Sequence, residues 1–205
     1  NAPSLLLRNE GGVLKPDRAN SNTLRNVGLV NSALWSDLNN DGWPELVLAC
    51  EWGPVRVFEN ERGTLRESTR ERGLALHAGW WTGISASDLD SDGRMDLVAG
   101  NWGLNGAEGA SSRQPLRLYF GDLMERGTVD LLETEYDGDS TEPMPARRLS
   151  DLGTALPVLR KRFPSHRAWA GSSARSILGH FKGVQEVAAS TFATAIFLNR
   201  RERFE

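Results

Sequence analysis

The sequence predicts an all-β fold built from repeated units of short strands and turns. Two nine-residue segments, residues 37–45 and 88–96, match position by position and lie 51 residues apart. An apolar strand that ends in Asn occurs three times, at Asn9, Asn60 and Asn199, and the first two are also 51 residues apart. Repeats of about 40 to 50 residues made of short strands and Gly-rich turns are typical of β-propeller blades. We therefore predict a partial β-propeller.

The expected strands follow the chain in a regular order. Apolar strands that lead to Asn are expected at residues 5–9 and 55–60. Each nine-residue loop is followed by an apolar run, residues 46–50 and residues 97–100, which is rich in strand formers and too short for a helix. The loops are therefore expected to connect one strand to the next.

The composition of the two loops predicts metal binding. Each has acids or an Asn at positions 1, 3, 5 and 9 and a Gly at position 6 that permits a sharp turn. The backbone carbonyl of position 7 can complete a shell of oxygen ligands, which suits Ca²⁺ better than Zn²⁺ or a redox metal. The predicted ligands are Asp37, Asn39, Asp41, the Trp43 carbonyl and Glu45 for one ion, and Asp88, Asp90, Asp92, the Arg94 carbonyl and Asp96 for the other.

Two other interpretations of these loops were weighed. An EF-hand starts with the same pattern but needs a Glu at position 12, where this chain has Leu48 and Ala99. Turns rich in Asp, Asn and Gly are also common where nothing binds. Two such loops in register favour the metal sites.

A third loop, residues 122–130, retains the first and last acids and the Gly but has Met124 and Arg126 at ligand positions 3 and 5. We predict no metal there. The Arg126 guanidinium can sit between Asp122 and Asp130 and supply the positive charge of an ion. Alternatively, the loop is held by packing alone.

These motifs resemble the FG-GAP, or VCBS, repeat proteins, whose relatives include the integrin alpha-subunit propellers. The similarity covers most of the chain and is strongest for a bacterial branch of the family. It is carried by Gly79, Trp80, Trp81, Gly83, Asp88, Asp90, Asp92, Gly93, Asp96, Gly100, Asn101, Gly103 and Asn105.

The resemblance implies a propeller of four-stranded blades with Ca²⁺ in the loops of many blades. It also implies a protein that is secreted, periplasmic or on the cell surface. Glu45 departs from the family pattern, where Asp is usual, so its longer side chain would loosen or reshape the first site. At 205 residues, the chain has room for about three blades, whereas propellers usually close with about four to eight. We therefore expect further blades in a longer parent chain.

A small helical insertion is expected in the last blade, at residues 146–182. Apolar residues at helical spacing after Ser150 predict two short helices, with Ser150 or Asp151 capping the first and Pro157 starting the second. A further helix is expected near residues 172–178. The predicted divisions are blades with both calcium loops at 1–145, the insertion at 146–182, and strands that complete the last blade at 183–205.

Charge is divided along the same boundary. Residues 146–182 carry a net charge of +7, and the rest of the chain carries −10. The basic side chains could meet an acidic or sulfated glycan or an acidic protein partner, or they could dock on the acidic blades or stay solvated. They are Arg147, Arg148, Arg160, Lys161, Arg162 and Arg167. No nucleic-acid recognition motif accompanies them, so nucleic acid is not an expected partner.

The sequence contains no apolar run long enough to cross a membrane and no recognisable catalytic motif. The single cysteine, Cys50, lies in an apolar strand pattern and is predicted to be buried. The predicted function is a calcium-binding extracellular or cell-surface propeller segment that acts as a binding or adhesion module, with a glycan or a surface protein as its ligand. The alternative is the propeller domain of a lyase-type enzyme that degrades acidic polysaccharides.

Overall fold

The computed structural model describes residues 3–104, 111, 113–138 and 140–205. The chain divides into two compact units, which we describe separately. The first unit comprises Asn1–Leu104 and Thr191–Glu205, and the second unit is Asn105–Ser190. The described strands form three sheets, and the helices are short, which confirms the predicted β-rich class. None of these helices has the length and apolar composition that a membrane crossing requires.

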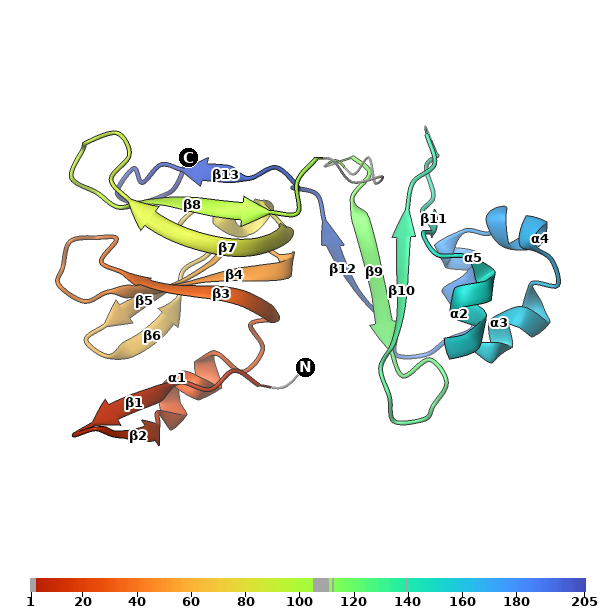
Figure 1. Ribbon diagram of the computed structural model, residues 1–205, viewed down its shortest axis with the longest axis horizontal. Helices are drawn as coiled ribbons and strands as arrows, with labels where there is room; N and C mark the ends of the chain where they lie inside the picture. The colour runs from red at the N-terminus through yellow and green to blue at the C-terminus, as the bar shows by residue number, and fades with distance from the viewer. Residues whose placement is uncertain (1–2, 105–110, 112, 139) are drawn as a thin grey trace. The chain divides into compact units, whose positions relative to one another are not determined.

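The first repeat of the first unit is an antiparallel meander of four strands (Figure 1). The strands are β3 (Leu29–Ser36), β4 (Glu45–Gly53), β5 (Arg56–Glu61) and β6 (Thr64–Glu67). The first six residues of β4 are all buried. Because alternate residues of a strand point to opposite faces, β4 supplies apolar side chains to both faces of this sheet.

The second repeat combines distant parts of the sequence. Strand β7 (Gly79–Ser87) pairs with β8 (Asp96–Asn101), and β8 pairs on its other side with β13 (Ala195–Phe197). After β13, an isolated antiparallel β-bridge pairs Asn199 with Phe204. The two repeats are also joined at the ends of β4 and β7, where Glu51 lies opposite Trp80.

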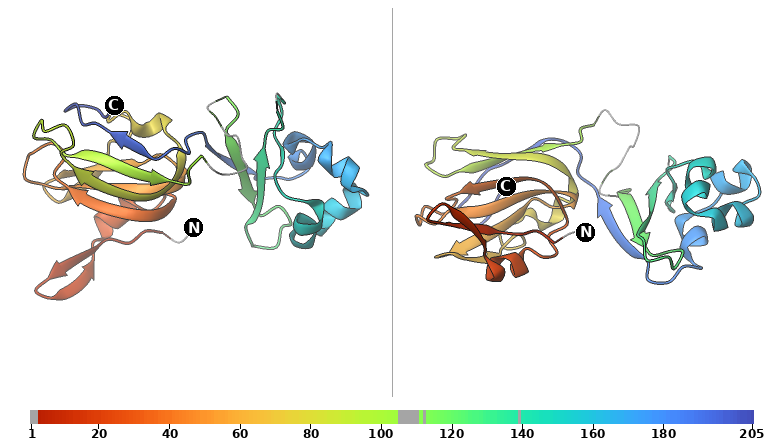
Figure 2. Two further views of the ribbon diagram at one scale, coloured as in Figure 1. Left: turned by 45° about the horizontal axis from the view of Figure 1, so that its top comes forward. Right: turned by 60° about the horizontal axis from the view of Figure 1, so that its bottom comes forward.

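Side chains from both repeats form the main core of the first unit. Val47 and Ala49 of β4 meet Trp81, Leu97 and other residues of the second repeat in one buried cluster. Accordingly, β7 and β8 lie over β4 and β5 in the ribbon (Figures 1 and 2). The other face of β4 belongs to a second cluster, whose members are Leu24, Val27, Leu46, Leu48, Cys50, Phe58 and Leu65. Burial of Cys50, predicted from its strand pattern, is confirmed.

The N-terminal segment contains the hairpin of β1 (Leu7–Glu10) and β2 (Val13–Pro16), followed by α1 (Arg18–Thr23). The Asp17 carboxylate caps α1 by accepting the Asn20 N–H. All eight residues of the hairpin are exposed. A short 3₁₀ helix, η1 (Leu74–Leu76), connects the two repeats.

The second unit has one sheet with helices packed against it. The strand order is β11 (Met144–Pro145), β10 (Asp130–Glu135), β9 (Leu116–Gly121) and β12 (Gln185–Ala189), all antiparallel. The helices are α2 (Leu149–Ala155), α3 (Pro157–Arg162), α4 (His166–Ala170) and α5 (Ala174–Leu178). Their apolar side chains cluster with Leu132 of β10 and with Tyr119 of β9, so this unit has a core of its own.

Local signals in the sequence located most of these helices. Pro157 starts α3, as predicted, because the first helical position needs no backbone N–H donor. The predicted cap at Ser150 or Asp151 is wrong, since α2 begins at Leu149 and Arg148 precedes it without a side-chain cap. Helix α4 was not predicted, although Ser165 caps it by accepting the Ala168 N–H.

The structure divides the chain differently from the predicted boundaries. The third loop and its strands belong to the compact unit of residues 105–190, together with helices α2 to α5, which lie within the predicted helical segment 146–182. Residues 183–205 do not complete one blade, because β12 pairs with β9 while β13 pairs with β8. The sequence-based division assumed that strands pair with their neighbours in sequence, which holds only as a tendency. Asn105, which ends the motif of the resemblance, lies outside the described residues.

Candidate metal sites

The three acidic loops share one backbone geometry. The carboxylate at position 1 accepts the backbone N–H groups of positions 5 and 6, at 3.1 and 2.9 Å for Asp37, 3.1 and 3.0 Å for Asp88, and 2.7 Å twice for Asp122. Because the two oxygens of one carboxylate accept both N–H groups, the side chain at position 1 holds the loop closed. The loops therefore fold alike, including the one with Met124 and Arg126 at ligand positions.

The backbone conformation explains why position 6 of each loop is glycine. Gly42, Gly93 and Gly127 have φ angles of +86°, +81° and +75°, a region that residues with a side chain rarely adopt. Position 4 also lies at positive φ, at +61° for both Asn40 and Ser91. Two left-handed residues in a short span turn the chain back on itself, so positions 1, 3 and 9 can converge.

In the second loop, the structure brings three predicted ligands together. Carboxylate oxygens of Asp88, Asp90 and Asp96 all lie within 4.8 Å of one another. Asp96 is fully buried and accepts backbone N–H groups from Leu89 (2.9 Å) and Asn199 (2.8 Å). Three acidic groups at this spacing repel one another unless positive charge is close by.

Arginines supply part of that charge in the second loop. Nη1 of Arg200 lies 2.6 Å from Oδ2 of Asp90 and 3.5 Å from Oδ2 of Asp92. The hydrogen bond from Arg200 lowers the pKa of Asp90. Arg94 pairs with Asp92 and also donates from Nε to the Asn199 carbonyl at 2.9 Å. Asp92, predicted as a ligand, is thus turned toward the two guanidinium groups.

The first loop has a different balance of charge. Glu45 is fully buried and accepts the Leu38 N–H at 2.8 Å. Burial raises the pKa of Glu45, with the nearby carboxylates of Glu59 and Asp41 adding to the effect, while backbone N–H groups oppose it. The amide of Asn39 makes long contacts with Glu45 (3.5 Å) and Glu59 (3.4 Å). An ionised Glu45 would be stabilised by a cation in this loop.

Two asparagines hold the loops from a neighbouring strand, a role that the sequence analysis missed. The Asn60 side chain donates to the Pro44 carbonyl at 2.9 Å, and the Asn199 side chain donates to the equivalent Met95 carbonyl at 3.1 Å. Asn199 also donates to Leu38 of the first loop at 2.8 Å, so it ties both loops together. Their place at the ends of repeated strands was the signal that could have revealed this role.

The donors in both loops fit a hard divalent cation. They are carboxylate, amide and backbone carbonyl oxygens, which is the ligand set of Ca²⁺ sites in proteins. Position 5 accepts the N–H of position 7 in each loop, at 2.8 Å from Trp43 and 2.9 Å from Arg94. Among the described residues, the acidic groups that the structure brings together are Asp88, Asp90 and Asp96, whereas Asp92 is paired with arginines and no such group forms from Asp37, Asp41 and Glu45. The ten predicted residues remain the candidate ligands.

The third loop contains an internal cation, in partial agreement with the prediction. Nη2 of Arg126 lies 2.9 Å from Oδ1 of Asp130 and 3.1 Å from the Ala155 carbonyl. Asp122 accepts backbone N–H groups instead of the guanidinium, so Arg126 does not bridge the two acids. The second oxygen of Asp130 is buried without a hydrogen-bond partner among the described residues.

Comparison with known families locates the repeat. Residues 37–99, which span both acidic loops, match the family model described as an FG-GAP-like repeat. The resemblance to FG-GAP repeat proteins is confirmed at this level. Searches of curated proteins and of solved structures found no match.

Proposed function

We propose that this FG-GAP-like repeat segment binds two calcium ions that stabilise a propeller-type binding module outside the cell. The observation that carries the proposal is the convergence of Asp88, Asp90 and Asp96 within 4.8 Å on a loop whose backbone geometry is repeated in the first loop. The ions would be structural. Each would neutralise packed acids and hold two strands of one repeat at a fixed distance.

The four-stranded meander of β3 to β6 and the two-stranded hairpin of β1 and β2 are consistent with successive blades of a propeller. A glycan or a surface protein is the proposed ligand, and the cell surface, the periplasm or the medium is the proposed location. Calcium sites of modest affinity, about 10⁻⁴ to 10⁻³ M, are filled in such compartments. The lyase-type alternative is tested by turnover assays on uronate polymers.

The test of the calcium proposal is thermal unfolding with millimolar calcium and with a chelator. Millimolar calcium is about one to ten times a dissociation constant of 10⁻³ to 10⁻⁴ M, which stabilises the folded state by about 0.4 to 1.4 kcal/mol per site, so calcium should raise the melting temperature measurably. Asp90→Asn should remove much of this increase, because it removes a ligand charge but keeps an amide acceptor. Asp137→Asn, an exposed acid outside the loops, is the matched control and should leave the increase unchanged. Equal melting temperatures with and without calcium would refute the proposal.

A further inference from the structure

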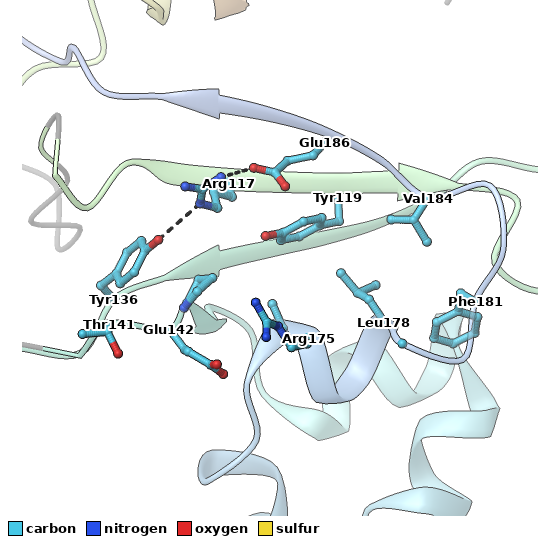
Figure 3. Close-up of a pocket in the computed structure, with 13 residues that line it drawn as sticks. Arg117, Tyr119, Tyr136, Thr141, Glu142, Arg175, Leu178, Phe181, Val184 and Glu186 are labelled. Carbon is cyan, nitrogen blue, oxygen red and sulfur yellow. Dashed lines mark hydrogen bonds and ion pairs between the residues drawn. The ribbon is translucent and has the colours of Figure 1, made fainter.

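The second unit contains a cavity of about 500 Å³ that is distant in sequence from both calcium loops. Strands β9 and β12 form its floor, and α5 forms one wall (Figure 3). Its volume lies within the range of about 300 to 1,000 Å³ that is common for small-molecule sites.

The floor of the cavity is set by strand alternation and register. Arg117 and Tyr119 are two residues apart on β9 and therefore point to the same face. Glu186 of β12 lies directly opposite Tyr119 in the sheet. Arg117 ion-pairs with Glu186 and donates from Nε to the Tyr136 hydroxyl at 3.3 Å, and these partners raise the pKa of Arg117. Its guanidinium is thus oriented before any ligand arrives, and its Nη2 has no hydrogen-bond acceptor among the residues that the structure describes.

One side of the cavity is apolar and aromatic. The ring of Tyr119 is half-buried, and it packs with Phe181 and Val184 against the helical cluster that contains Leu178 (Figure 3). Burial is the main reason that the pKa of Tyr119 is raised. A tyrosine ring in this setting offers a flat apolar surface beside polar groups.

Two charged side chains at the cavity are not used by the fold. Arg175 of α5 and Glu142 line the cavity, are exposed, and have no side-chain hydrogen bond or ion pair within the described part of the chain. Arg175 belongs to the segment 146–182, whose net charge is +7. Within the described residues, Arg175 therefore offers an unpaired guanidinium to an anionic group of a ligand, at a cavity whose other charged lining residues are Arg117, Glu142 and Glu186.

We propose that this cavity binds a sugar ring that carries a carboxylate, such as a uronic acid. The C–H face of the ring would pack on Tyr119, and the carboxylate would accept hydrogen bonds from Arg175 in the fork geometry that guanidinium groups offer. The ring hydroxyls would pair with Glu142 and with the oriented guanidinium of Arg117. This site lies in the second unit and does not depend on the calcium sites of the first unit.

The experiment is an NMR titration of the whole chain in millimolar calcium with sodium glucuronate, a glucuronate-containing oligosaccharide, and glucose. Glucuronate should bind and glucose should bind about tenfold more weakly, because the neutral sugar lacks the charge-assisted hydrogen bonds. Binding of the oligosaccharide alone would support the same site with contacts to neighbouring sugar units, provided that Arg175→Gln abolishes it. Failure of both acidic ligands to bind would overturn the proposal.

Matched variants separate a specific site from general attraction to the basic segment. Arg175→Gln should weaken binding by about tenfold or more. Arg167→Gln removes the same charge from an exposed position on helix α4, outside the cavity, and should leave binding unchanged. Tyr119→Leu should abolish binding while Tyr119→Phe, which keeps the ring and the packing, should retain it. Equal losses in the Arg167 and Arg175 variants would also overturn the proposal. Loss of calcium binding would leave these results unaffected, so the two proposals can fail separately.

Discussion

Arg200 contacts the acids of the proposed calcium site in the second loop. It lies 2.6 Å from Asp90, and the two residues are 110 positions apart in the sequence. A guanidinium and a divalent cation compete for the same carboxylate oxygens. We expect Arg200→Gln to raise the calcium affinity of the second loop by about two- to fivefold, the range expected from breaking one exposed ion pair.

The same change should lower the melting temperature in chelator, since the acids then lose a positive neighbour. Isothermal titration calorimetry measures the affinity, and Arg25→Gln, an exposed arginine away from the loops, is the control. An unchanged affinity in the Arg200 variant would show that the guanidinium and the ion do not compete.

Cys50 provides a second test at the scale of one residue. Burial raises the pKa of its thiol from the usual 9.0 to about 11. The thiolate fraction near pH 8 should therefore be about 100-fold lower than in the unfolded chain. We expect a thiol reagent to label the native protein very slowly and to label it rapidly in denaturant.

The raised pKa of Cys50 also determines how the stability of the folded state changes with pH. A raised pKa in the folded state means that this group's favourable contribution is complete below pH 9 and is lost as the pH rises toward 11. Rapid native labelling at pH 8 would show that β4 is not covered as the structure describes.

At the scale of elements, Asn199 contacts both acidic loops, whereas, within the described part of the chain, Asn9 contacts only its own turn. Asn199 is fully buried, donates to Leu38 and Met95, and accepts the Arg201 N–H at 3.1 Å. Asn199→Ala leaves the buried Leu38 carbonyl and the partly buried Met95 carbonyl without this donor and should lower the free energy of unfolding by about 2 to 4 kcal/mol. Urea denaturation measures the loss.

Asn9→Ala is the matched control for this prediction. Asn9 has the same place in its hairpin and accepts the Gly12 N–H at 2.8 Å, but its side chain is exposed. We expect a loss below about 1 kcal/mol, as for most surface substitutions. Similar losses in the two variants would show that the contacts of Asn199 with the loops contribute little.

At the scale of the whole molecule, the second unit interrupts the second repeat. The two ends of the interruption are held together within the first unit, because the Gly103 N–H donates to the Phe192 carbonyl at 2.9 Å and the Asn101 side chain donates to Thr191 at 2.9 Å. A short Gly/Ser linker can therefore replace residues 105–190 without moving β8 or β13.

We expect the shortened chain to unfold cooperatively and to keep its response to calcium, as judged by thermal melts followed by circular dichroism. The second unit has its own core of Leu132, Leu152, Ile177 and neighbouring side chains, so it should fold when produced alone. A shortened chain that melts without a cooperative transition would show that the first unit requires the second.

The sequence by itself determined the parts of this protein that depend on near neighbours. Loop shape follows from Gly42 and Gly93 at positive φ and from Asp side chains that bind N–H groups four and five residues ahead. The burial of Cys50 follows from its place in a continuous apolar run, and the start of α3 follows from Pro157. Each of these rests on contacts or conformations within a few residues, which a pattern in the sequence encodes directly.

Only the tertiary structure decided which distant segments meet. It pairs β13 with β8, brings Arg200 to Asp90, and assembles a cavity from Arg117, Arg175 and Glu186. The third loop shows the limit clearly: its sequence repeats the pattern of the first two, yet its strands join a separate unit with the helices. The physical reason is that strand partners and ion pairs are chosen by packing of the whole chain, for which separation in sequence is no guide.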